Sequence, residues 1–373
     1  MFGKWSERGK TPIGIDFGAR SVRAVQLTAQ GDRWRVSAAG VAALGAQVPD
    51  SGVEHAKAVA EALVRVLEST SFSGKRVVTA LPSSAVQCKN LRLPPMPPNE
   101  LQAAVEWEAA DRLKLGQTYQ IQFFDAGEVR QGEDLRQEII LLAAPTATIE
   151  QHVNLLVACG LEPEAIDVDA SALARCALDC VHTNSEQVQL VLDLGVSGSN
   201  VLISKQGRVM FFKRIDIGGK HVEDAIAKQF NMSTAEASNI LVQRAMGTAT
   251  GDASLVGLTR KENAVQAISD AVRPVLTDLC REVGLCLRYQ GVTFRGQRAT
   301  SALLTGGGSR DPMLGEILAR ETGLAVEMLD TAGTFDWSGV DESTLALCPT
   351  HSWAVALGLA LRSEHRAAMK EAA

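Results

Sequence analysis

The sequence predicts an α/β protein with two lobes, and three observations lead to this class. At 373 residues the chain is longer than a single hydrophobic core usually supports. Residues 13–27 and 188–203 both read as an apolar strand, an Asp-x-Gly turn and a second strand, which indicates two related halves. Helical periodicity follows each copy, over 53–69 and 221–229, so each half is expected to be a sheet covered by helices.

The stretch between the two halves has elements of its own. A strand over 77–81 ends at Pro82, and an amphipathic helix is expected over 100–115. Strands over 121–124 and 138–144 flank a polar stretch at 127–136, and a helix over 146–159 ends at Gly160. These elements predict a small inserted βαββα subdomain.

The second half is rich in helix. Its helices are expected over 233–246 and 264–290, and a strand over 302–305 runs into Gly306, Gly307 and Gly308. A final helix is expected over 352–362.

Composition excludes several classes of partner. The formal net charge is -6 and no Lys/Arg-dense block is present, so nucleic acid is not an expected ligand. The longest apolar runs, 139–149 and 353–361, fall short of the roughly 20 residues that cross a bilayer. The first ten residues lack the apolar segment of a secretory signal, so we expect the protein to stay in the cytoplasm.

The first Asp-x-Gly turn has the groups needed to bind phosphate. Glycine lets the main chain approach a phosphate, because it has no Cβ and tolerates positive φ. Gly18 is therefore expected to offer its backbone N–H, and Arg23 on the outgoing strand a positive charge. Asp16 is placed to orient a hydrated Mg²⁺ ion, which prefers one or two carboxylates together with water and phosphate oxygen.

Two further turns repeat this chemistry later in the chain. Asp193 and Gly195 form the second turn with the hydroxyls of Ser197 and Ser199. The triple glycine at 306–308 stands directly before a helix, where an adenine or a phosphate can lie against bare backbone. Each turn alone is more often a plain hairpin or a flexible loop. Their order along one chain indicates a shared site.

With these three turns the sequence resembles the superfamily of actin, sugar kinases and seventy-kilodalton heat-shock ATPases, and more narrowly the PilM family of type IV pilus assembly. The resemblance spans nearly the whole chain. It rests on the segments GIDFGARSVRAVQL, LPSSAVQCKNLRLPPMPPNELQAAVEWEA, CGLEPEAIDVDASALARC, VLDLGVSGSNVLI, IDIGGKHVEDAIAKQF, LLTGGGSR and AVALGLALR. It implies an actin-like fold of the ribonuclease H-like type.

The resemblance also implies ATP or ADP as ligand, with Mg²⁺ held by Asp16 and Asp193 through water. The residues that match the nucleotide-binding motifs fall into four groups: Asp16, Gly18, Ser21 and Arg23 in the first phosphate loop, Asp193, Gly195 and Ser197 in the second, Gly306, Gly307, Gly308 and Ser309 in the adenosine loop, and Glu236 for the ribose hydroxyls. A solvated helix carboxylate remains the alternative for Glu236. The chain departs from the family at Ala19 and Arg20, where hydroxyls are usual, and at Arg23 and Asn239, where Lys is usual.

The same resemblance implies a division of the chain. Lobe 1 is expected to comprise 1–81, 162–186 and 346–373, and lobe 2 to comprise 187–345, with a helical subdomain at about 229–300. The insert, 82–161, matches the partner-binding subdomain shared with FtsA. Its expected partner is the cytoplasmic tail peptide of a PilN-like membrane protein, which would hold the chain at the inner membrane as a peripheral protein. Pilus motor ATPases, the platform protein and a second copy of the chain are further candidate partners.

Three functions stay in competition at this level. The leading one is a nucleotide-dependent scaffold with slow or no hydrolysis, since no motif supplies a general base. A small-molecule kinase would need such a base, and no motif selects one among the aspartates, which include Asp167 and Asp169. FtsA-like chains end in a basic amphipathic helix and GspL-like chains continue through a membrane span, and neither pattern is expected after Arg362.

Overall fold

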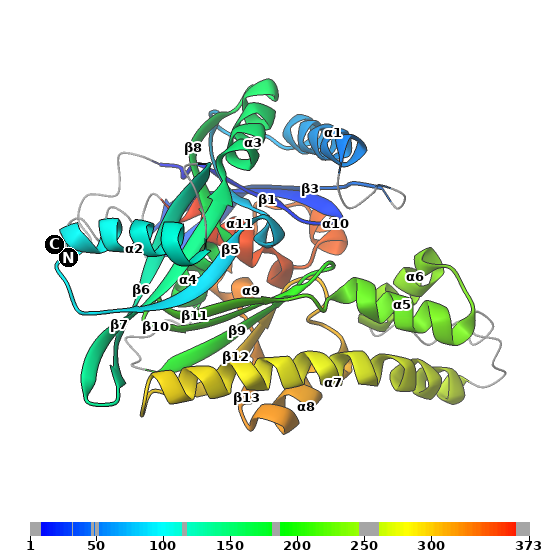
Figure 1. The fold of residues 1–373 in the computed structure, drawn as a ribbon. Coiled ribbons are helices and arrows are strands. Elements are labelled where there is room, and N and C mark those ends of the chain that lie inside the picture. The colour runs from blue at the N-terminus through cyan, green and yellow to red at the C-terminus, as the bar shows by residue number, and fades with distance from the viewer. Residues whose placement is uncertain are drawn as a thin grey trace.

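Two mixed β-sheets, each covered by helices, form the two lobes of the protein, and a third sheet belongs to an insert (Figure 1). The computed structural model describes residues 9–31, 33–45, 48, 52–113, 118–180, 187–245 and 261–362. The predicted two-lobed α/β class is confirmed. Among these residues, none of the helices combines the length and the apolar content that a bilayer span requires.

The first lobe is built on a six-stranded sheet with the order β14-β3-β2-β1-β4-β8. Its strands are β1 (Ile13–Phe17), β2 (Ser21–Gln30), β3 (Arg33–Ala43), β4 (Arg76–Leu81), β8 (Glu162–Val168) and β14 (Phe335–Asp336). Its helices are α1 (Val53–Ser69), α3 (Thr146–Ala158), α4 (Asp169–Cys180), α10 (Glu342–Leu347) and α11 (Ala354–Ala360).

Strand alternation decides which helix covers which face of this sheet. Ile13 and Ile15 of β1 are buried on one face, against Leu63 and Val66 of α1. Gly14 faces the opposite side, where a Cβ would lie only 2.6 Å from the backbone nitrogen of Ala360. Glycine at this position therefore lets α11 lie directly against the sheet.

The second lobe is built on a five-stranded sheet with the order β11-β10-β9-β12-β13. Its strands are β9 (Val188–Leu194), β10 (Ser199–Lys205), β11 (Arg208–Ile215), β12 (Ala299–Thr305) and β13 (Ala325–Met328). Its helices are α5 (Gly219–Phe230), α6 (Thr234–Ala245), α7 (Lys261–Thr293) and α8 (Pro312–Thr322). The short helix α9 (Thr331–Thr334) follows β13 and contacts α4 and β14 of the first lobe. Strand β9 and helix α8 contribute to one main core, which includes Leu190, Leu192, Leu314 and Ile317.

The insert contains β5 (Gln87–Leu93), α2 (Pro98–Leu113), β6 (Tyr119–Gln131) and β7 (Asp134–Pro145), after a 3-10 helix at Ser83–Ala85. Leu141 in the central strand β7 packs against Val105 of α2, whereas Ile140 and Leu142 on the opposite face join the main core. The polar stretch 127–136 was expected to separate two short strands. It instead continues both strands of one long hairpin. Buried and exposed residues alternate along this part of β6, where Val129 is buried, as expected for a strand with one face on the core.

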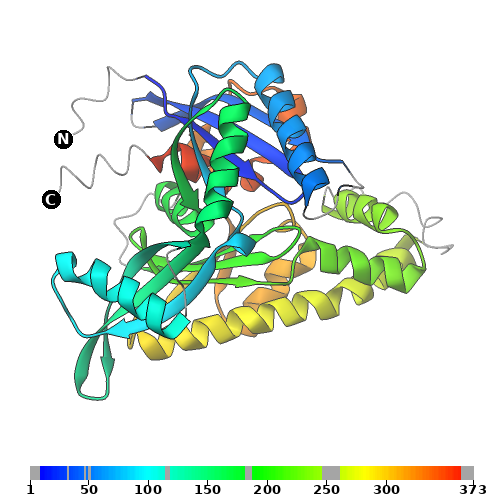
Figure 2. The ribbon, with the colours of Figure 1, turned by 45° about the horizontal axis from the view of Figure 1, so that its top comes forward.

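The insert is fastened to the second lobe at the C-terminal end of α7 (Figure 2). Glu138 of β7 is fully buried and accepts hydrogen bonds from Asn90 at 3.1 Å, Arg92 at 2.8 Å and Tyr289 of α7 at 2.8 Å. Arg92 also donates to Thr293 of α7 at 3.2 Å. Hydrogen bonds therefore hold the insert to the second lobe.

Two segments pack in a different domain from the one expected from their position in the sequence. Helix α3 falls within the range expected for the insert, yet its Leu156 is buried in the core beneath α1. Strand β14 pairs in parallel with β3, so the chain returns to the first sheet at Phe335, ahead of the expected boundary at residue 346. Neither shift was visible in the local sequence, because burial of α3 and pairing of β14 depend on residues far along the chain.

Candidate functional site

The two Asp-x-Gly hairpins have the same internal geometry. Asp16 pairs in register with Arg23, and Asp193 pairs with Asn200, each seven residues further along the chain. The N–H of Gly18 donates to the carbonyl of Ser21 at 3.0 Å, and the N–H of Gly195 donates to the carbonyl of Gly198 at 3.1 Å. Both glycine amides therefore close their own turns.

In the first hairpin Arg23 forms an ion pair with Asp16. Nη1 of Arg23 donates to Oδ2 of Asp16 at 2.7 Å, and both side chains are mostly buried. Burial opposes the charge on Arg23, but the adjacent carboxylate outweighs it and raises the pKa of the guanidinium above its usual value. A Cβ at Gly18 would lie 3.6 Å from Nη1 of Arg23, so this turn lies close to the ion pair.

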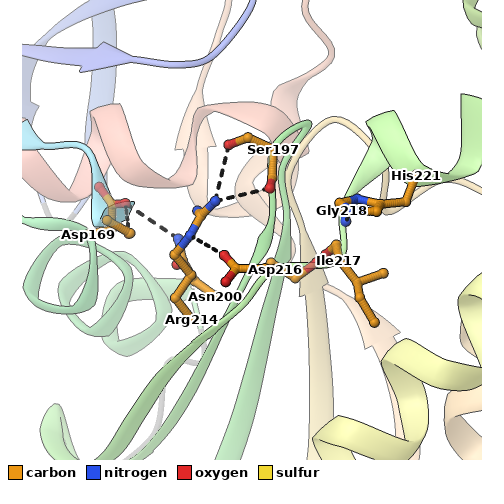
Figure 3. A network of polar contacts seen from close by, with 10 residues as sticks. Asp169, Ser197, Asn200, Arg214, Asp216, Ile217, Gly218 and His221 are labelled. Atoms are coloured by element: carbon orange, nitrogen blue, oxygen red, sulfur yellow. Dashed lines mark hydrogen bonds and ion pairs between the residues drawn. The ribbon is translucent and has the colours of Figure 1, made fainter. Parts of the chain in front are cut away.

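In the second hairpin Asn200 links two carboxylates. Its amide donates to Asp193 at 3.1 Å and to Asp169, at the start of α4, at 3.4 Å (Figure 3). Ser197 at the turn accepts hydrogen bonds from Arg214, at 3.0 Å to its carbonyl and 3.3 Å to its hydroxyl. The same guanidinium donates to Asp216 at 3.1 Å. Arg214 therefore fixes the Ser197 turn to the end of β11.

The third turn packs directly on the second hairpin. Gly306 has a φ of +88°, and a Cβ there would lie 2.7 Å from the carbonyl oxygen of Leu194, so this position requires glycine. The N–H of Gly308 donates to the same carbonyl at 3.0 Å. Ser309 is buried, and its hydroxyl donates to the carbonyl of Gly306 at 2.7 Å, which stabilises the loop from within.

These turns meet at a cavity of about 410 Å³ between the lobes. Of the residues singled out from the sequence, Ser21, Arg23, Gly195, Gly307 and Gly308 line it. Polar side chains that were not singled out also line it: Arg20, Glu223, Ser238, Arg310, Asp311 and His351. The apolar part of the wall comes from both lobes and includes Val41, Val196, Val222, Leu241, Leu276 and Leu347.

Glu236 makes local hydrogen bonds at the start of its own helix. It is exposed on the first turn of α6 and accepts hydrogen bonds from the N–H and the hydroxyl of Ser233, at 2.8 and 2.7 Å. These bonds lower its pKa and cap the helix. The carboxylates that line the cavity among the described residues are those of Glu223 in α5 and Asp311, and Ser238 of α6 adds a hydroxyl.

Asp16, Asp169 and Asp193 form a buried acidic cluster beside the cavity. Burial, reinforced by the charges of Asp16 and Asp193, raises the pKa of Asp169 to about 7. Burial and the charge of Asp16 raise the pKa of Asp193 to about 6. Ser83 donates a short hydrogen bond to Asp169. Asp169 does not stand out from the other aspartates in the sequence, because only the fold brings the start of α4 beside both hairpins.

The acidic cluster fits a cation that keeps most of its water. Among the described residues, no group of three His, Cys, Asp or Glu side chains is arranged to enclose a metal ion. Mg²⁺ needs only one or two carboxylates when water and phosphate supply the remaining ligands. None of the residues that the structure describes donates a hydrogen bond to the buried Oδ1 of Asn200 next to the cluster, so this oxygen can accept from a water molecule of such an ion.

The lobes, the paired hairpins and the glycine-rich loop at an interlobe cavity define a protein with the actin-like fold. Residues 14–364 match the family model of type IV pilus assembly protein PilM. The chain belongs to the PilM family.

Solved structures show the same fold. A PilM-PilN type IV pilus biogenesis complex contains a chain with 24% identity and a TM-score of 0.76, and the match covers 94% of this chain and 98% of that one. The ethanolamine utilization protein EutJ from Carboxydothermus hydrogenoformans has 16% identity and a TM-score of 0.52, with 96% and 91% covered.

Proposed function

We propose that this protein is an ATP-binding scaffold of the type IV pilus inner-membrane assembly platform, with slow or no hydrolysis. The observation that carries the proposal is the convergence of residues from all three turns on one cavity between the lobes. A nucleotide placed there contacts both lobes, so its binding energy can favour one relative position of the lobes over another. Membership of the PilM family supports the pilus assignment.

In this proposal the first hairpin, with Asp16, Gly18, Ser21 and Arg23, faces the phosphates opposite Asp193, Gly195 and Ser197. Asp16 and Asp193 hold Mg²⁺ through water, and Arg23 must exchange Asp16 for a phosphate oxygen in order to bind it. The loop formed by Gly306, Gly307, Gly308 and Ser309 receives the adenosine. Glu236 remains a prediction for the ribose hydroxyls, in competition with its bonds to Ser233.

The partner in this proposal is the cytoplasmic tail of a PilN-like membrane protein. A relative with the same fold is described as part of a PilM-PilN complex, which supports this choice. We place the docking site on the insert, because its sheet ends in two outer strands, β5 and β6, that can extend a β-ladder to a peptide. Docking of this kind would keep the protein on the cytoplasmic face of the inner membrane without a span of its own.

Calorimetric titration with Mg·ATP tests the nucleotide site. Gly307→Val is the decisive variant, because a Cβ at Gly307 meets no atom of the described part of the chain within 4 Å and so fills the cavity without a clash. Gly284→Val in α7 is the matched control, since a Cβ there is equally unobstructed. Binding by the wild type and by Gly284→Val, with a loss of at least about tenfold in affinity for Gly307→Val, supports the proposal. Equal affinities in all three proteins contradict it.

The scaffold function is tested by pull-down with a PilN-type tail peptide, with and without Mg·ATP. Retention of the protein by the peptide that changes with Mg·ATP supports a nucleotide-dependent scaffold. No retention in either condition rejects the scaffold function. Incubation with labelled ATP and a panel of sugars and acids separates the kinase alternative, which requires transfer of the label.

A further inference from the structure

An ion pair joins the two lobes at the cavity. Arg20 lies in the turn between β1 and β2 of lobe 1, and Glu223 lies in α5 of lobe 2. Both terminal nitrogens of Arg20 donate short hydrogen bonds to the two carboxylate oxygens of Glu223. Nη1 of Arg20 also donates to the hydroxyl of Ser238 in α6, at 3.1 Å. One side chain of lobe 1 is thus bound to two helices of lobe 2.

Both partners of this pair are fixed to their own lobes. The carbonyl of Arg20 accepts a hydrogen bond from the N–H of Leu44 at 2.9 Å, which ties the turn to the end of β3. Helix α5 begins against the second hairpin, because the amides of Gly219 and Lys220 donate to the carbonyls of Gly195 and Val196 at 2.9 Å. Relative movement of the lobes at this point must therefore strain or break the pair.

The surroundings of the two charges differ. The side chain of Glu223 is 6% exposed, whereas that of Arg20 is 46% exposed. A buried carboxylate needs its partner more than a half-exposed guanidinium does, because only the guanidinium can be solvated in place. Both side chains line the cavity, so an anionic ligand would meet Arg20 and Glu223 together.

We propose that Arg20 is an exchange residue: without ligand it holds the lobes together through Glu223, and it transfers to an anionic group of the ligand when one occupies the cavity. This proposal rests on the proposed nucleotide function, with phosphate as the anion. The planar fork of arginine forms the same two-point contact with carboxylate and with phosphate, so one side chain serves both states. Glu223 then competes with the ligand for Arg20, and the helices α5 and α6 are released from lobe 1 on binding.

Two variants of the pair separate this exchange from a purely structural contact. Without ligand, Arg20→Ala and Glu223→Gln should both speed amide hydrogen exchange in α5 and in the first hairpin by about fivefold or more. Towards Mg·ATP they should diverge. Glu223→Gln removes the competitor and should bind about fivefold more tightly, whereas Arg20→Ala loses the phosphate contact and should bind more weakly. Glu282→Gln, which breaks an exposed pair with Lys213 on the same lobe, is the control and should change neither.

Three results overturn the exchange. One is unchanged hydrogen exchange in both variants of the pair, which shows that it does not hold the lobes. Another is weaker ATP binding by Glu223→Gln, which makes Glu223 a ligand contact rather than a competitor. The third is the absence of ATP binding in the wild type and all variants, which rejects the exchange together with the nucleotide function. In that case amide hydrogen exchange without ligand still decides whether the ion pair joins the lobes.

Discussion

Replacement of Glu138 by Gln should weaken the attachment of the insert to the second lobe. The carboxylate is fully buried and accepts from three donors: Asn90 and Tyr289 share Oε1, and Arg92 donates to Oε2. A glutamine has a single acceptor oxygen. Its best orientation keeps the two bonds at the Oε1 position and points the amide nitrogen at the nitrogen of Arg92.

The cost follows from the bonds that are lost. A hydrogen bond to a charged group contributes about 1.5–3 kcal/mol, and the charge of Arg92 is left without its carboxylate. The side chain of Arg92 is 34% exposed, so water offsets part of that penalty. We expect Glu138→Gln to lower the free energy of unfolding by about 3 kcal/mol. Tyr289→Phe removes one bond from the same carboxylate and should cost about half as much.

Urea denaturation of the full chain measures these losses, and hydrogen exchange in β5 and β7 shows where they act. The double variant of Glu138→Gln and Tyr289→Phe should cost less than the sum of the single ones, because the hydrogen bond from Tyr289 is worth less once its acceptor is a neutral amide rather than a carboxylate. Glu282→Gln on α7 again serves as control, with an expected change below about 0.5 kcal/mol. A loss for Glu138→Gln no larger than that of the control would refute the role of Glu138 in joining the insert to α7.

Three further variants test separate parts of the structure. Gly306→Ala places a Cβ against Leu194 at a φ of +88° and should lower the free energy of unfolding by about 2 kcal/mol in thermal or urea denaturation. Gly307→Ala should leave it unchanged, and equal stability of the two variants would contradict the tight packing of Gly306 on Leu194. Arg310→Ala removes a cation from the cavity wall and should weaken Mg·ATP binding about tenfold by calorimetry, and unchanged affinity would exclude Arg310 from the site. Burial lowers the pKa of His152 to about 4 from 6.5, so the unfolded chain binds more protons than the folded protein between these values. The contribution of His152 should therefore lower the free energy of unfolding by up to about 3 kcal/mol as the pH falls from 6.5 to 4. His152→Asn should reduce this fall, and an identical pH profile would reject the prediction.

Helix α7 connects the cavity with the insert. Helix α7 lines the cavity at Leu276 and contacts the insert at Tyr289 and Thr293. In the proposed function, a peptide on the insert and a nucleotide in the cavity would therefore both act on this helix. The proposed dependence of peptide retention on nucleotide has a physical route through α7.

Local sequence was sufficient to place most of the helices. The predicted helix 53–69 coincides with α1, and the predictions 264–290 and 146–159 differ from α7 and α3 by a few residues. These segments have helical apolar periodicity that depends only on their own residues. The strands predicted on either side of 127–136 do pair as a hairpin, but they are longer than predicted, because polar residues near the tip of a long hairpin are held by cross-strand pairing rather than by their own pattern.

The sequence by itself determined the fold class, the repeated Asp-x-Gly hairpins and the glycine-rich loop, because turn chemistry and strand alternation are encoded in neighbouring residues. Only the tertiary structure decided which charges meet. Arg20 and Glu223 are 203 positions apart in the sequence. Asp169 of the first lobe accepts a hydrogen bond from Asn200 of the second lobe. Glu236 is the opposite case, because its carboxylate caps its own helix through Ser233, three residues away. Pairing between distant side chains depends on the packing of whole lobes, and no local pattern records it.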